Sequence, residues 1–131
     1  MHFTTMTDRQ LTLLAAINMI VAVSAGAFGA HGLRRFVTPE LLAVWHTGVQ
    51  YHLVHALGLF LVSWLSTRYP ATGLLSIAGL LMFVGIVLFS GSLYALTLTG
   101  TRWLGAITPL GGVAFLLAWA MVAWSAWRAP A

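Results

Sequence analysis

The stretch GLLSIAGLLMFVGIVLFSGSLYALTL, residues 73–98, decides the fold class of this chain. It holds fourteen Leu, Ile, Val and Phe residues and no charged residue. A helix needs about 20 predominantly apolar residues to cross the ~30 Å hydrocarbon core of a bilayer. On the insertion scale, these fourteen side chains favour insertion by roughly 4–8 kcal/mol. The stretch therefore predicts a membrane-spanning helix.

Outward from this stretch, the rest of the chain repeats the pattern. Of 131 residues, 60% are hydrophobic and 6% are charged, whereas about 25% are charged in soluble domains. Four charge-free runs separate the charged residues: 10–33, 41–67, 69–101 and 103–127. Each run is long enough to span a membrane. We expect an all-α, integral membrane four-helix bundle, with residues 1–131 forming a single transmembrane domain.

Local signals place the helix ends. Residues 7–10 fit a capping box, and Thr38-Pro39-Glu40 is a favourable helix start. Pro70 ends the second helix, and the fourth is expected to begin between Trp103 and Pro109. The predicted helices cover residues 8–30, 39–66, 71–98 and 104–127. Their short connections favour an up-down-up-down order.

The first apolar segment could also be a signal peptide, because Ala25-Gly26-Ala27 resembles a cleavage site. The residues before it offer only Arg9 beside Asp8, which is a poor positive region, so we interpret the segment as a retained first helix. Orientation stays open. Arg9, Arg68 and Arg128 face one side, and Arg34, Arg35 and Arg102 face the other, so the positive-inside rule gives a tie. The adjacent Arg34-Arg35 pair favours a cytoplasmic position for its loop.

The composition excludes several classes of protein. Without cysteine, the chain has no disulfide, thiolate metal site or catalytic thiol. Its arginines are scattered and form no basic stripe, which argues against nucleic-acid binding. We interpret Arg34, Arg35 and Arg102 as contacts to lipid headgroups, and the pairs Trp45/Trp64 and Trp103/Trp124 as markers of the two membrane interfaces.

Small residues mark close helix packing. Gly26, Gly29 and Gly32 lack the strand and the G-x-G element of a phosphate-binding loop. Glycine lets a second helix approach closely, so the first and third helices should present small-residue faces to a close partner. The packing glycines are Gly26, Gly29, Gly32, Gly79 and Gly91.

The second helix carries most of the polar side chains. His52 and His55 lie near its midpoint, where an ionisable residue is by default a functional-site hypothesis. Asn18 and Ser24 of the first helix, and Ser76, Ser90, Tyr94 and Thr97 of the third, are available as partners. The candidate cluster is His31, His46, Gln50, Tyr51, His52, His55, Ser90 and Tyr94.

Three interpretations of this cluster stay open: a seam of interhelical hydrogen bonds, which we favour, a histidine-only metal or haem site, or a pocket for a polar ligand or lipid headgroup. The only acids, Asp8 and Glu40, lie outside the spans. With no carboxylate to pair with or orient the histidines, ion-coupled transport and hydrolysis are disfavoured. We therefore expect no enzyme, no bound metal and no cofactor.

Four blocks of the sequence resemble a known family. These are Gly26–Leu33 (GAFGAHGL), Trp45–His52 (WHTGVQYH) with His55-Ala56, Ser90–Tyr94 (SGSLY) and Ile107–Gly112 (ITPLGG). They are similar to the signature of the YgdD-type family, a domain-of-unknown-function family of small multi-pass membrane proteins with mitochondrial relatives. The resemblance implies four membrane helices in a bacterial inner membrane and supplies no catalytic assignment that could be carried over.

The resulting expectation is a small non-enzymatic inner-membrane protein with a structural or accessory role. We expect it to self-associate or to join a membrane complex. A ligand-, lipid- or haem-binding module is the alternative, and a small transporter or channel is third.

Overall fold

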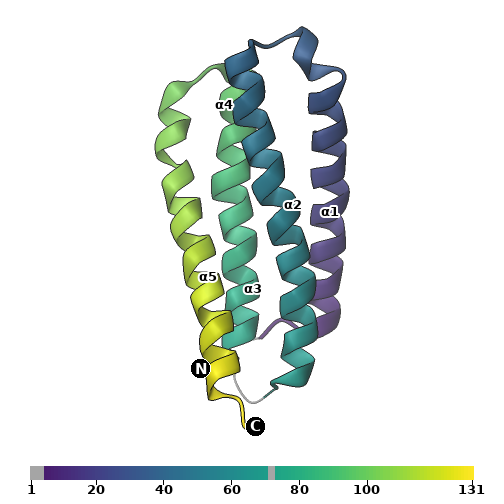
Figure 1. The fold of residues 1–131 in the computed structure, drawn as a ribbon, viewed down its shortest axis with the longest axis vertical. Helices are drawn as coiled ribbons and strands as arrows, with labels where there is room; N and C mark the ends of the chain where they lie inside the picture. Colours follow the sequence, from purple (N-terminus) through teal and green to yellow (C-terminus); the bar gives the residue numbers. More distant parts are fainter. Residues whose placement is uncertain (1–4, 71–72) are drawn as a thin grey trace.

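The computed structural model describes residues 5–70 and 73–131, in which every regular element is helical. Four helical columns stand side by side and alternate in direction (Figure 1). Each column is long and apolar enough to cross a membrane; the candidate spans are Asp8–Arg35, Pro39–Arg68, Leu74–Thr99 and Arg102–Arg128. The predicted all-α fold with four membrane-spanning helices is confirmed.

The first two columns begin where the capping signals predicted. Helix α1 spans Asp8–Ala30, and the side chain of Thr7 accepts a hydrogen bond from the backbone N–H of Gln10 at 3.2 Å. A 3-10 turn, Leu33–Arg35, leads into α2, Pro39–Arg68. Helix α2 runs two residues beyond the predicted end. It stops at Tyr69, because a residue before proline disfavours the helical conformation.

The third column is not a uniform α-helix. It consists of α3, Leu74–Gly85, a π-helical turn, Ile86–Ser90, and α4, Gly91–Thr99. The predicted start at residue 71 lies outside the described residues. Hydrophobic periodicity did not predict the π-helix, because a turn of this kind inserts a residue without changing the apolar character of the segment. Gly100 ends α4 with a φ of 70°, a left-handed conformation that favours glycine.

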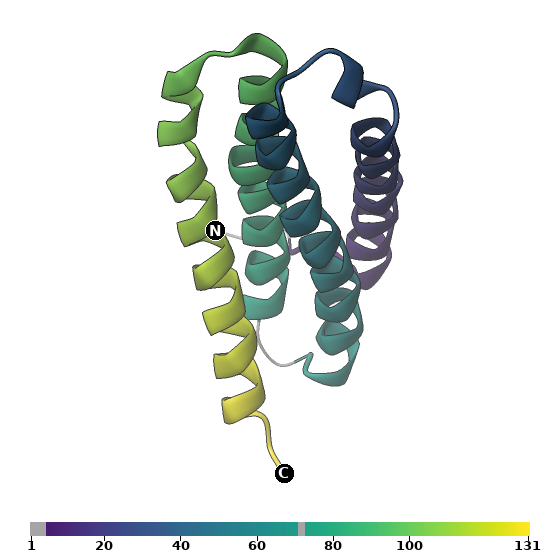
Figure 2. The same cartoon turned by 45° about the horizontal axis from the view of Figure 1, so that its top comes forward.

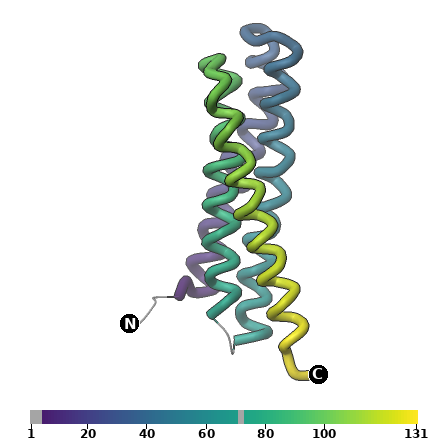
Figure 3. Tube along the Cα trace, turned by 90° about the vertical axis from the view of Figure 1, so that its left-hand side faces the viewer, coloured from purple at the N-terminus to yellow at the C-terminus, as the bar shows by residue number. Residues whose placement is uncertain are grey.

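The fourth column starts with a 3-10 turn, Arg102–Ala106, and continues as α5, Thr108–Arg128. The α-helix thus begins within the predicted interval, with Pro109 in its first turn. Viewed obliquely, α1 and α5 stand at opposite sides of the molecule (Figure 2). The side view shows all four columns running along the long axis (Figure 3). Helices α2 and α3–α4 are therefore the central pair.

The apolar core lies between these central helices and their neighbours. Its fully buried members come from all four columns: Leu11, Ala15, Leu59, Val62, Leu75, Met82, Ile86, Phe115 and Ala118. The contact between α5 and the π-helix is close, since a Cβ at Gly111 would come within 2.8 Å of the Cα of Phe89. The backbone of Phe89 thus leaves no room for a side chain at residue 111.

Three of the five predicted packing glycines, Gly26, Gly29 and Gly79, have a close partner on another helix of the same chain. A Cβ at Gly29 would lie 2.7 Å from the ring of Trp45 on α2, and one at Gly79 would lie 2.5 Å from Leu11 on α1. Gly26 packs against Val49 of α2. Gly32 faces Phe28 of its own segment, and Gly91 meets only the carbonyl of Ile86 within 4 Å. The small-residue faces therefore hold the bundle itself together.

Candidate functional site

The inner side of α2 brings two histidines into the middle of the bundle. His52 and His55 are 3% and 4% exposed; His52 contacts α1 and α4, and His55 contacts α5. An imidazole inside a membrane bundle needs partners for both ring nitrogens, because lipid offers none. Their hydrogen bonds therefore define what each ring can do.

His52 links α1 to α4. Its Nε2 lies 3.1 Å from Oδ1 of Asn18, and its Nδ1 lies 2.9 Å from the hydroxyl of Tyr94. The Asn18 amide nitrogen donates to the carbonyl of Leu14 at 2.9 Å, which fixes Oδ1 as the atom facing His52. Because that oxygen only accepts, Nε2 carries the proton and Nδ1 accepts from Tyr94.

His55 has the opposite tautomer. Its Nδ1 lies 2.7 Å from the carbonyl oxygen of Tyr51, so this nitrogen carries the proton. Its Nε2 accepts from the indole N–H of Trp119 on α5 at 3.0 Å. The imidazole also stacks on Phe115, with ring centroids 3.5 Å apart. This pair of contacts joins α2 to α5.

Together, these contacts form two adjacent sets of hydrogen bonds that reach all four columns, and we name their residues the histidine network: Asn18, Tyr51, His52, His55, Tyr94 and Trp119. All four ring nitrogens of the two histidines are engaged, so neither ring offers a free lone pair to a metal. Among the described residues, no group of three or more His, Asp or Glu side chains is placed to hold a metal ion. The geometry matches a hydrogen-bonded seam.

Further interhelical hydrogen bonds flank the network. Ser90, in the π-helix, donates to the carbonyl of Gly48 on α2 at 2.7 Å. The Thr97 hydroxyl is shared between the carbonyl of Leu93 in its own helix, at 2.9 Å, and that of Leu41 on α2, at 3.2 Å. The Trp45 indole donates to the carbonyl of Ala25 on α1 at 2.8 Å. Polar side chains thus connect α2 to its neighbours at several levels.

Two tryptophans differ from the sequence-based expectation. Trp45 was interpreted as an interface marker but is 5% exposed and packs against Tyr94, at 4.5 Å between ring centroids. Trp119 was not predicted as a site residue. The sequence did contain a signal for Trp119, because this residue lies near the middle of the fourth span, whereas tryptophans are enriched at the membrane interfaces.

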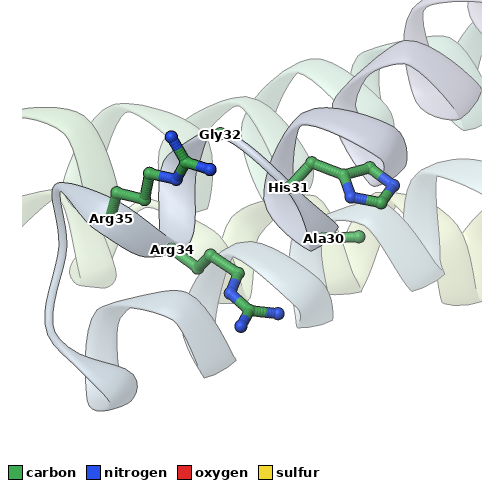
Figure 4. Close-up of a pocket in the computed structure, with 5 residues that line it drawn as sticks. All are labelled: Ala30, His31, Gly32, Arg34 and Arg35. Atoms are coloured by element: carbon green, nitrogen blue, oxygen red, sulfur yellow. The ribbon is translucent and has the colours of Figure 1, made fainter.

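The structure does not bring all the candidate residues together. His46 and Gln50 lie on the exposed side of α2, away from the histidine network. His31 lies at the end of the bundle, where it lines an open cavity of about 450 Å³ together with Ala30, Gly32, Arg34 and Arg35. The three basic side chains there point in different directions (Figure 4). Arg102 is exposed in the next loop at the same end.

Comparison with known proteins identifies the family. The family described as "Protein of unknown function (DUF423)" matches residues 25–112. The UPF0382 membrane protein YwdK of Bacillus subtilis is 58% identical over 110 residues, covering 84% of this chain and 89% of YwdK. A UPF0382 membrane protein of Staphylococcus epidermidis is 45% identical over 107 residues, covering 82% of this chain and 86% of its own length. No solved structure matches. The expected membership of a family of small membrane proteins is confirmed: the chain belongs to the DUF423 family.

Proposed function

We propose that this protein is a non-enzymatic structural or accessory component of the bacterial inner (plasma) membrane. One observation carries the proposal: both histidines at mid-span use both ring nitrogens in hydrogen bonds to their own chain. Groups that are fully paired in this way cross-link helices, each bond adding about 0.6–1.7 kcal/mol in a membrane. The histidine network therefore links neighbouring helices by hydrogen bonds and stabilises the bundle.

The surroundings of the network support the same role. Its neighbours are aromatic and aliphatic, and the only acidic side chains, Asp8 and Glu40, lie in the first turns of α1 and α2, about ten or more residues along each helix from the network. General acid–base or nucleophilic chemistry requires a group that can gain or lose a proton beside a substrate. Here, an added proton at His55 would break the hydrogen bond that its Nε2 accepts from Trp119, because an indole N–H only donates.

The test examines the protein purified from its own host in mild detergent. We expect no haem absorption band and less than about 0.1 equivalent of any transition metal by elemental analysis, in the same range as a His52→Phe/His55→Phe variant. A stoichiometric metal or haem that is lost in this double variant would contradict the proposal. The exposed His46→Phe variant is the matched control.

A headgroup-binding module is the second candidate, and the cavity beside Arg34 and Arg35 favours it. Two guanidinium groups beside an open cavity suit a lipid phosphate. Native mass spectrometry with phosphatidylglycerol would then show fewer retained lipids for the double variant Arg34→Gln/Arg35→Gln than for a control double variant. The control is Arg68→Gln/Arg128→Gln, which removes two arginines at the opposite end of the bundle. Equal retention in the two variants would exclude this module.

A further inference from the structure

The outer side of α2 carries an exposed stripe along its whole length. Exposed residues recur at alternating intervals of four and three positions: Ala43, Thr47, Gln50, Val54, Leu57, Leu61 and Trp64. We name these residues the α2 stripe. Such a 3.5-residue period is the seam of a left-handed helix pair. In Figures 1 and 2, α2 lies in front of α4 near the top of the bundle, so one side of α2 is not covered by another helix there.

Gln50 is the exceptional member of the stripe. It lies about 5 Å along the helix from the midpoint of Pro39–Arg68, well inside a hydrocarbon core with a half-thickness of ~15 Å. On the helical wheel it lies about 160° from His52, so it points away from the histidine network. Its exposed carboxamide makes no hydrogen bond to the residues that the structure describes.

Several other exposed polar side chains of the spans are paired within the chain, although the His46 ring and the Tyr51 hydroxyl, like Gln50, make no hydrogen bond to the described residues. Thr12 shares a hydrogen bond with Ser63 at 2.7 Å, Ser24 donates to the carbonyl of Ile20, and Thr47 donates to that of Ala43. A carboxamide cannot be paired by lipid tails, and an unpaired amide in an apolar medium costs several kcal/mol. Gln50 therefore needs a partner from outside this chain.

We propose that α2 pairs in parallel with α2 of a second copy, with Gln50 facing Gln50 of the partner subunit. Two copies inserted with the same topology are related by a twofold axis along the membrane normal, so equal residues meet at equal depth. A carboxamide both donates and accepts, so two glutamines satisfy each other. A foreign partner would need a matching polar group at this one depth.

The rest of the stripe fits this pairing. Ala43 and Thr47 are small and allow close approach at one end, while Val54, Leu57 and Leu61 supply apolar contacts beyond Gln50. A polar residue at one seam position fixes the register of a helix pair. This pairing rests on the structural role proposed above, and it adds that the partner is a second copy of this chain.

The chain has no cysteine, so single cysteines test the pairing directly. Val54→Cys and Leu57→Cys should form disulfide-linked dimers in liposomes at least about 10-fold faster than Ile20→Cys and Leu116→Cys, because only facing positions meet often. The controls lie near mid-span on α1 and α5 and are more exposed, at 67% and 71% against 50% and 59%.

Gln50→Leu tests the role of the carboxamide. In the Val54→Cys background, it should weaken association about 5- to 30-fold when protein is diluted in lipid, whereas Gln50→Asn should retain part of the affinity. Because the Gln50 side chain makes no hydrogen bond to the described residues, circular dichroism should show unchanged helix content for both variants.

Three outcomes would overturn the pairing: cross-linking at Ile20→Cys or Leu116→Cys that matches the stripe positions, association unaffected by Gln50→Leu, or a cross-linked product with a different protein where purified copies stay monomeric. None of these outcomes bears on the histidine network, whose role is tested separately by the metal content and the haem absorption of the purified protein. A failure of the pairing is thus distinguishable from a failure of the proposed function.

Discussion

Two tyrosines of the bundle have hydroxyl groups in different surroundings. The Tyr94 hydroxyl donates to Nδ1 of His52, whereas the Tyr51 hydroxyl makes no hydrogen bond to the described residues, although the Tyr51 ring packs against Phe89 and Phe115. A lost hydrogen bond matters most where it leaves a buried partner unpaired. At the scale of the residue, the histidine network therefore depends on the partners of the histidines as much as on the histidines.

Tyr94→Phe should destabilise the folded protein by about 1 kcal/mol, because Nδ1 of His52 would be left buried without a donor. The matched control, Tyr51→Phe, should change stability by less than about 0.5 kcal/mol. Unfolding measured in mixed micelles gives both values. Equal effects of the two substitutions would show that the bond to His52 does not contribute.

At the scale of the element, the contact between α5 and the π-helix positions Trp119 and Phe115 against His55. Gly85 and Gly111 make this contact possible, since a Cβ at either position would overlap Phe115 or Phe89. Ser90, the last residue of the π-helix, donates to the backbone of α2. The irregular turn thus joins the central helix pair to α5 at the level of the network.

Gly111→Ala should lower stability by roughly 1–3 kcal/mol, because its Cβ would meet the backbone of Phe89 and push α5 outward. Gly112→Ala should be neutral or stabilising, since a Cβ there meets nothing within 4 Å and alanine favours a helix by ~1 kcal/mol. Thermal unfolding in detergent compares the two neighbours. A milder effect at residue 111 than at residue 112 would contradict the packing.

The sequence was informative wherever a local rule sufficed. The capping box at Thr7, the Thr38-Pro39 start and the charge-free runs predicted α1, α2 and the number of spans. The length of the second helix placed His52 and His55 near mid-span but could not tell which residues supply their partners. Trp119 and the π-helix depend on how α5 meets α3–α4, and that contact is long-range. No local pattern encodes it.

At the scale of the whole molecule, the alternating columns put both ends of the described chain on one side of the membrane. Helix α1 starts and α5 ends at the same end of the bundle, where α2 also ends (Figure 1). The 3-10 turns Leu33–Arg35 and Arg102–Ala106 lie at the other end. This topology requires an even number of spans.

Labelling of single cysteines with a membrane-impermeant maleimide tests this arrangement in intact cells. Phe36→Cys and Trp103→Cys, both highly exposed, should react from one side of the membrane. Thr5→Cys and Ala131→Cys should react together from the opposite side. Labelling of Thr5→Cys and Ala131→Cys from different sides would contradict the four-span topology.

The central claim is that His52 and His55 are neutral, that all their ring nitrogens are hydrogen-bonded, and that they link neighbouring helices. Nitrogen-15 spectra of the histidine rings in lipid bilayers, assigned with His52→Phe and His55→Phe variants, measure this directly. We predict two neutral imidazoles of opposite tautomer: Nε2–H at His52, from its bond to Asn18, and Nδ1–H at His55, from its bond to Tyr51. Both spectra should stay unchanged when zinc or haem is added. A charged ring, the same tautomer at both residues, or a shift on adding metal would contradict the claim.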